Sequence, residues 1–222
     1  SKGEKMILEK EIQVKSSDRV RNHGEVLTAR REVEAMLDLV KNESERIDSR
    51  FLEPACGDGN FLVAILERKL KTVASRYRTK KADFEVQMLS ALASIYGIDL
   101  LEDNVQIARN RMFEIACNCY KNSLKTKSDE QFQNIMKFIL SKNILQGDSL
   151  NGIDKIVFTQ WTLVCYQFKR EEFSFSQLNQ QAEILSTPLF ASLTNDKGED
   201  VFIPQPIKEY PLTFYRNLGG LT

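Results

Sequence analysis

Apolar positions recur at intervals of three and four residues in several segments, which is the period of an amphipathic helix. From Thr28 onward, Val33, Met36, Leu37 and Val40 follow this spacing, and Thr28 is well placed to cap the helix. The same period predicts further helices over residues 61–74, 84–95, 102–120 and 130–140.

Short apolar segments separate these helices and have the length of buried strands. They cover residues 51–52, 96–100 and 143–148, and glycines or acids stand at their ends. Strands that alternate with helices favour a parallel sheet. The predicted fold class is therefore α/β, a Rossmann-like sheet with helices on both faces.

The pattern changes after residue 151, where strand-like alternation replaces the helical period. Residues 155–164 and 167–175 resemble two strands, and residues 176–185 resemble a short helix. Residues 189–203 resemble a hairpin around a turn-rich tetrapeptide at 195–198. We divide the chain into an N-terminal arm (residues 1–17), a core (residues 18–150) and a small, mostly β C-terminal extension of the same domain (residues 151–222).

Composition and charge narrow the class of protein only a little. Hydrophobic residues make up 42% of the 222 residues, and 31 basic residues balance 31 acidic ones, so net charge gives no evidence about nucleic acid. Four cysteines without paired spacing and a single histidine, His23, predict no metal site. We expect reduced thiols and a cytoplasmic protein, since no apolar run approaches the ~20 residues that cross a bilayer.

The segment Glu53-Pro-Ala-Cys-Gly-Asp-Gly59 lies between a predicted strand and a predicted helix. Its two glycines allow a sharp turn and a close approach of a ligand to the backbone. A dinucleotide site would favour a third glycine where Leu62 stands, so a pyrophosphate ligand is disfavoured. The acid inside the loop suits a ligand with an ammonium and a sulfonium better.

Acids also end the next two predicted strands. Asp99 ends the second strand, where a carboxylate can bind both hydroxyls of a ribose. Asp148 ends the third strand, where an acid can accept a hydrogen bond from an adenine amino group. Three such loops at one edge of a parallel sheet predict a ligand crevice there.

The sequences of these loops resemble those of a known family. Phe51-Leu-Glu-Pro-Ala-Cys-Gly-Asp-Gly-Asn-Phe-Leu62 resembles the first motif of adenine-N6 DNA methyltransferases from restriction–modification systems. His23-Gly-Glu-Val-Leu-Thr28 resembles the segment that precedes this motif, although Leu27-Thr28-Ala29 replaces the family's usual Phe-Thr-Pro. The similarity covers about residues 18–150 and implies a methyltransferase fold that binds S-adenosylmethionine.

The resemblance also implies roles for individual residues. Thr28 would help hold the methionine part of the cofactor, a role compatible with capping the helix. Asp58 would either anchor the loop or reach the amino group of the cofactor. The remaining cofactor residues implied are Glu53, Ala55, Gly57 and Gly59 at the methionine end, Asp99 and Leu100 at the ribose and adenine, and Asp148 and Ser149 at the adenine amino group.

The family's catalytic motif, Asp/Asn/Ser-Pro-Pro-Tyr/Phe after a fourth strand, has no counterpart in the sequence. The chain contains no Pro-Pro pair, and the corresponding strand ends in Thr159, Gln160 and Trp161. Gln160 could orient an amino group and Trp161 could stack on a flipped base, but a strand with a packed tryptophan is the favoured interpretation. The catalytic residues are therefore unknown.

Two main functions remain open at this point. The leading hypothesis is a methyltransferase with DNA as its substrate, and the alternative is a catalytically degenerate cofactor-binding subunit that needs a partner protein. Methylation of RNA or protein is a weaker third possibility. A basic stretch (Arg68, Lys69, Lys71, Arg76, Arg78, Lys80 and Lys81) could contact phosphates, although a solvated helix face is the more common meaning of such a run.

Overall fold

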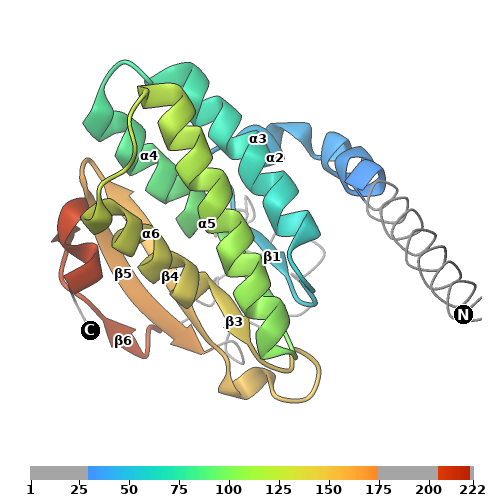
Figure 1. Ribbon diagram of the computed structural model, residues 1–222. Coiled ribbons are helices and arrows are strands. Elements are labelled where there is room, and N and C mark those ends of the chain that lie inside the picture. Colours follow the sequence, from blue (N-terminus) through green and yellow to red (C-terminus); the bar gives the residue numbers. More distant parts are fainter. Residues whose placement is uncertain (1–29, 175–204, 221–222) are drawn as a thin grey trace, which may run out of the picture.

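The structure is a computed structural model that describes residues 30–174 and 205–220 (Figure 1). Residues 30–39 are helical, and the helices that follow are α2 (Lys41–Glu45), α3 (Asn60–Tyr77), α4 (Lys81–Ala93), α5 (Glu102–Leu124) and α6 (Glu130–Asn143). Two short 3-10 helices are η1 (Ile153–Lys155) and η3 (Tyr215–Gly220). The strands are β1 (Phe51–Glu53), β2 (Ile95–Asp99), β3 (Ile144–Gln146), β4 (Val157–Val164), β5 (Gln167–Ser174), β6 (Lys208–Glu209) and β7 (Thr213–Phe214).

Strands β1, β2 and β3 form a parallel sheet with β2 in the middle. Phe51 pairs with Ile95, and Asp99 pairs with Gln146, so all three strands end at the same edge. The connections between them contain α3 and α4, or α5 and α6, as crossovers between parallel strands require. The mixed α/β class predicted from the alternation of elements is confirmed.

Helices α3 and α5 cover one face of this sheet and lie side by side (Figure 1). Gly97 on β2 permits the close packing, since a Cβ there would lie 2.7 Å from Cδ1 of Leu62. Leu62, Ile65 and Leu66 are fully buried on α3, and each such burial stabilises the fold by about 2 kcal/mol.

The opposite face of the sheet packs against the start of β4. Tyr96 and Ile98 of β2 form a small apolar cluster with Ile156 and Phe158. The Tyr96 hydroxyl also donates a 2.7 Å hydrogen bond to the Thr159 carbonyl. We predicted helices on both faces, but in the described part of the chain an extended segment covers this one, because Ile156 and Phe158 alternate toward the sheet.

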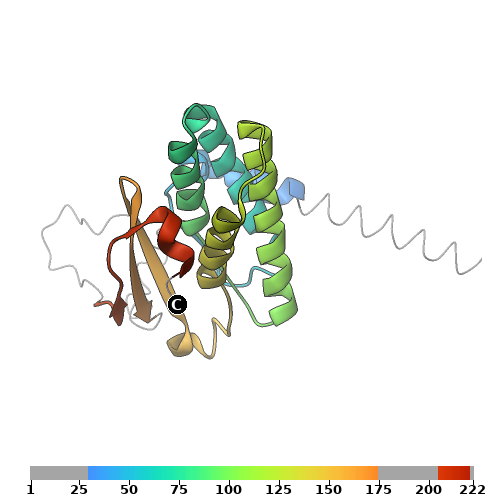
Figure 2. The same cartoon turned by 60° about the vertical axis from the view of Figure 1, so that its left-hand side comes forward.

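The second sheet is antiparallel and forms a layer beside α6 (Figure 2). Strands β4 and β5 form a hairpin, and β6 and β7 both pair with β5. Trp161 and Phe168 from this hairpin are buried in the main core, where β4 contacts α4 and α6. The two strands predicted over residues 155–164 and 167–175 are thus confirmed within a residue or two.

The 3-10 helix η3 ties a distant part of the chain to the helices. Buried Glu85 of α4 accepts hydrogen bonds from the hydroxyls of Tyr120 (2.8 Å) and Tyr215 (2.7 Å). Arg216 donates to both carboxylate oxygens of Glu85, at 2.6 and 2.8 Å, and pairs with Asp129 at 2.7 Å. The buried carboxylate is therefore neutralised and fully bonded, as a buried charge requires.

The helices differ from the prediction in their bounds and in one exposed face, and α3, α5 and α6 each extend three or four residues further than predicted, to Tyr77, Leu124 and Asn143. The helix predicted over residues 84–95 ends at Ala93, and Ile95 begins β2 instead, because the helical and strand periods cannot be separated in a continuous apolar run. On residues 30–39, Leu37 is buried as expected, but Met36 is 58% and Val40 39% exposed. The predictions for residues 1–17, 176–185 and 189–203 lie outside the described residues.

Candidate functional site

The loop after β1 turns sharply and begins α3. Gly57 and Gly59 adopt φ values of +55° and +95°, in the left-handed region that side chains disfavour. A Cβ on Gly59 would also lie 2.9 Å from Cβ of Ala108 on α5. Gly57 is therefore required for its backbone conformation, and Gly59 is required for lack of space as well. Gly59 is also the N-cap residue of α3, whose N-terminus carries a partial positive charge.

Asp99 connects this loop to the second loop of the site. Its Oδ2 accepts a 2.9 Å hydrogen bond from the Gly57 amide, although the two residues lie 42 positions apart. Its Oδ1 accepts hydrogen bonds from the Leu101 amide at 2.9 Å and from the Asn104 side chain at 3.1 Å. Burial alone would raise the pKa of Asp99, but these three hydrogen bonds outweigh it and hold the pKa below its ordinary value.

The third loop closes on the first through Ser149, whose hydroxyl donates a 2.9 Å hydrogen bond to the Pro54 carbonyl. Asp148 accepts hydrogen bonds from the amides of Asn151 (3.0 Å) and Leu150 (2.9 Å), and these lower its pKa. The three predicted loops thus meet at the carboxyl edge of the sheet, each joined to another by a hydrogen bond.

Large apolar side chains project into solvent at this edge. Leu100 is 62% exposed and Leu150 is 88% exposed. Apolar side chains exposed beside polar groups can provide contact area for a flat ligand. They flank the two carboxylates Asp99 and Asp148.

Glu53, Ala55 and Cys56 form the start of the first loop. The Glu53 carboxylate accepts a hydrogen bond of 3.2 Å from the Ala55 amide, and burial raises the pKa of Glu53. The Cys56 amide donates to the Ile98 carbonyl at 2.9 Å, which aligns the loop with β2. Burial, together with the charges of Asp99 and Glu53, raises the pKa of Cys56 to about 12, so this side chain is an unreactive thiol.

Asp58 is held by Arg111 of α5. The Arg111 guanidinium donates to the Asp58 carbonyl at 2.8 Å and to Oδ1 of Asn60 at 3.0 Å, and it lies 3.5 Å from the Asp58 carboxylate. This geometry favours anchoring of the loop as the role of Asp58. The sequence did not indicate Arg111, because its contact with Asp58 joins residues 53 positions apart. The prediction also omitted Asn104, although its position shortly after Asp99 could have indicated the hydrogen bond between the two side chains.

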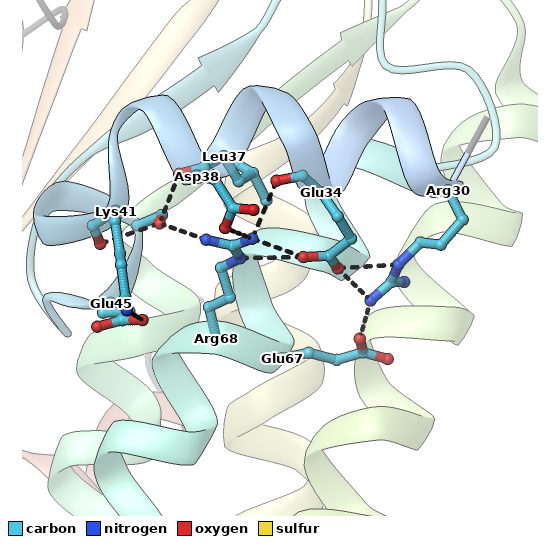
Figure 3. A network of polar contacts seen from close by, with 9 residues as sticks. Arg30, Glu34, Leu37, Asp38, Lys41, Glu45, Glu67 and Arg68 are labelled. Carbon is cyan, nitrogen blue, oxygen red and sulfur yellow. Dashed lines mark hydrogen bonds and ion pairs between the residues drawn. The ribbon is translucent and has the colours of Figure 1, made fainter. Parts of the chain in front are cut away.

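Thr28 lies outside the described residues, but the helix that follows it is fixed to α3 (Figure 3). Arg68 of α3 contacts Glu34 and Asp38, each at 2.7 Å. Arg30 pairs with Glu34 at 2.8 Å and also with Glu67. These ion pairs join the two helices alongside the apolar contact of the buried Leu37 with the core.

The basic stretch does not form one continuous basic face. Lys69 is fully buried, and its ammonium donates to the carbonyls of Arg46 (2.7 Å) and Ile47 (3.1 Å). Arg68 is bound in the ion pairs above, and Lys80 contacts Asp83 at 3.5 Å. The stretch therefore contains both structural and exposed residues. Neither a phosphate-binding face nor a solvated helix face describes all of it.

The segment in the place of the fourth motif is structural. The Trp161 ring is buried, donates a 2.8 Å hydrogen bond to Oδ1 of Asn143 and packs edge-to-face against Phe138 and Phe168. Gln160 is half-buried in the same antiparallel strand. The interpretation of Trp161 as a packed core residue is confirmed, and it cannot stack on a flipped base from this position.

Comparison with known proteins supports the class of protein. The family model for the MmeI DNA-methyltransferase domain matches residues 27–196. Since the match covers most of the chain, the protein belongs to this family of restriction–modification DNA methyltransferases. No curated protein and no solved structure gives a significant match. Within residues 30–174 and 205–220, none of the helices has the length and apolar character needed to cross a membrane.

Proposed function

We propose that the protein is an S-adenosylmethionine-dependent DNA methyltransferase with a Rossmann-like core. The observation that carries the proposal is the hydrogen bond between Asp99 and Gly57, which joins the ribose-binding acid of one loop to the glycine turn of another. Membership of a DNA-methyltransferase family supports the reaction class. The resemblance of residues 51–62 to adenine-N6 enzymes supports adenine as the target base.

The residues at the carboxyl edge fit the proposed cofactor. Gly57 leaves the backbone open for the methionine end, beside Glu53 and Ala55, whereas Gly59 lets the loop pack closely against Ala108 of α5. Asp99 retains acceptor capacity, because Oδ2 accepts a single hydrogen bond and each carboxylate oxygen has two lone pairs. One ribose hydroxyl would bind there, and a second would replace the Asn104 amide.

The adenine end of the ligand would lie between the second and third loops. Leu100 and Leu150 supply apolar contact, and the Asp148 carboxylate accepts a hydrogen bond from an amino group. Ser149 keeps this loop against Pro54. When bound, adenosylmethionine supplies an electrophilic methyl group. The chain's own residues bind the cofactor, orient it and exclude water from it.

Calorimetry with adenosylmethionine tests the proposal directly. We expect binding by the wild-type chain and a loss of at least about tenfold in affinity for Asp99→Ala, because two hydrogen bonds from a ribose are removed. Asp103→Ala is the matched control, since this exposed carboxylate lies on the next turn outside the loop cluster. Absence of binding, together with an Asp99→Ala variant that behaves like wild type, would refute the proposal.

A second candidate function is a cofactor-binding subunit that requires a partner for catalysis or DNA recognition. The supporting observation is that β4 pairs antiparallel with β5 and buries Trp161, so the described residues place no catalytic motif beside the cofactor loops. Transfer of tritiated methyl groups to unmethylated DNA separates the two candidates. Robust transfer by the isolated chain would exclude the second one, whereas cofactor binding without transfer would favour it.

A further inference from the structure

The helical layer ends in a tip on the side of the parallel sheet opposite to the proposed cofactor loops. Figure 1 and Figure 2 show the α3–α4 turn (residues 78–80) and the α5–α6 loop (residues 125–129) side by side at this tip. Helices α3 and α5 both start at the carboxyl edge, and the 23 residues of α5 make it about 34 Å long. The tip therefore lies roughly 30 Å from the proposed cofactor site.

The register between α3 and α5 brings the two ends to the same level. A Cβ on Gly59 would lie 2.9 Å from Cβ of Ala108, and Sγ of Cys119 lies 3.9 Å from the Leu70 carbonyl. In both contacts a residue of α3 meets the residue 49 positions later on α5. Because two parallel helices rise equally per residue, the same offset places the α3–α4 turn level with the α5–α6 loop.

Positive charge is concentrated at this tip. In residues 76–81 and 121–127, seven of the thirteen residues are basic and none is acidic, although the whole chain has 31 residues of each sign. All seven basic residues are exposed. Of the acids that follow these segments, Asp83 pairs with Lys80, and Glu85 and Asp129 pair with Arg216. A chain without net charge therefore has a strongly basic surface at the tip.

Four of these cations are available to a ligand. The side chains of Arg78, Lys121, Lys125 and Lys127 make no hydrogen bond, ion pair or ring contact with the described residues. They lie at the ends of α3 and α5 and in the loop that follows α5. An anion that reaches the tip can therefore bind these four side chains without breaking an interaction of the fold.

Helix stability alone does not account for this charge. Lys121 lies in the last turn of α5, where a cation suits the negative end of the helix dipole. Lys80 and Lys81, in contrast, are the N-cap and the first residue of α4, where the dipole disfavours cations. The Lys80 side chain also makes no capping hydrogen bond, so an aspartate or serine would stabilise α4 better. The tip thus carries positive charge where the helix itself favours an acid.

The chemistry of the tip suits a phosphate backbone better than a protein. Among the described residues, the large hydrophobic side chains that are exposed all lie outside residues 76–81 and 121–127. Protein interfaces, in contrast, are centred on aromatic and aliphatic anchors. Thr79, Asn122 and Thr126 add exposed hydroxyl and amide groups between the cations. Lysine, arginine, threonine and asparagine are all side chains that contact DNA phosphates.

We propose that the tip binds the phosphate backbone of double-stranded DNA, independently of sequence, through Arg78, Lys121, Lys125 and Lys127. The inference rests on DNA as the substrate class of the proposed function, and it adds a DNA contact remote from the cofactor loops. This contact leaves the carboxyl edge free for the target base. It raises the affinity for DNA without reading or touching the base that receives the methyl group.

Fluorescence anisotropy of a labelled DNA duplex, titrated with the full chain, measures this contact. The double variant Lys121→Gln/Lys127→Gln should bind at least about tenfold more weakly at about 0.1 M salt. Its plot of log affinity against log salt concentration should be shallower by about 2, because two phosphate contacts are lost. Arg31→Gln/Lys71→Gln is the matched control, since these exposed cations are also unpaired among the described residues but lie outside the tip.

Further measurements separate this inference from the proposed function and from other partners. Both double variants should unfold in urea as wild type does and bind adenosylmethionine with unchanged affinity, so failure of cofactor binding in wild type would concern the proposed function alone. Duplexes of unrelated sequence should show the same loss. Unchanged DNA binding by the Lys121→Gln/Lys127→Gln variant, or an equal loss in the control, would overturn the proposal. Polyglutamate that competes as well as unlabelled duplex would overturn it in favour of an acidic protein.

Discussion

The Arg111 guanidinium of α5 donates a 2.8 Å hydrogen bond to the backbone carbonyl of Asp58, in the glycine turn of the proposed cofactor loop. The same guanidinium bonds Asn60 at the start of α3, so one side chain spans the turn. It therefore acts as a positioning residue for the loop.

Replacement of Arg111 tests this role. For Arg111→Met we expect a loss of about 10- to 150-fold in affinity for adenosylmethionine, because a charged hydrogen bond of about 1.5–3 kcal/mol no longer fixes the loop. Calorimetry measures the affinity, and Asn110→Ala, on the adjacent exposed position of α5, is the control. Unchanged affinity in the Met variant would show that the loop keeps its conformation without Arg111.

The two glycines of the turn allow a matched comparison. Gly57→Ala should lower the free energy of unfolding by about 1–2 kcal/mol, the cost of a left-handed residue with open space around its Cβ. Gly59→Ala should cost more, about 3 kcal/mol, because its Cβ would also meet Ala108. Urea unfolding of both variants measures the difference, and equal losses would contradict the packing argument.

Lys69 makes stability depend on pH. Burial lowers its pKa from 10.5 to about 7, although the nearby charge of Asp48 opposes this. Between these values the unfolded chain holds a proton that the folded chain lacks, so stability rises with pH by up to about 1.4 kcal/mol per unit and this gain is lost as pH falls toward 7. We expect this slope in wild type relative to Lys69→Met, from urea unfolding between pH 7 and 10. Parallel profiles of the two proteins would show that Lys69 stays charged when folded.

The contact between Glu85 and Arg216 should be strongly cooperative. Arg216→Met leaves a carboxylate buried without its cation and should cost about 3–5 kcal/mol. Combining it with Glu85→Gln should cost less than the sum of the two single changes, because the second change removes the unpaired charge. A double-mutant cycle by urea unfolding measures the coupling, and additive effects would show that the two residues act independently.

Much of the fold was predictable because its elements follow local rules. Helix α5 and strands β2 and β3 were predicted near their observed bounds, since a 3.6-residue period and short apolar runs are properties of neighbouring residues. The convergence of the loops that carry Asp99 and Asp148 on the first loop was also predictable, because parallel strands end at one edge.

Other features depend on contacts between distant residues and left no local signal. The burial of Lys69 depends on carbonyls about twenty positions earlier, and the sequence alone assigns it to an exposed basic run. The burial of Trp161 depends on Asn143 and Phe138 of α6, which lie 18 and 23 positions earlier. Such features need the three-dimensional arrangement before they can be recognised.

The bond between Arg216 and Glu85 also bears on the order of events during synthesis of the chain. The two residues are 131 positions apart, so the ribosome makes the carboxylate long before the cation that neutralises it. Until Arg216 emerges, burial of the Glu85 carboxylate would leave it without its cation. Complete neutralisation of this buried charge therefore requires the segment that carries Arg216.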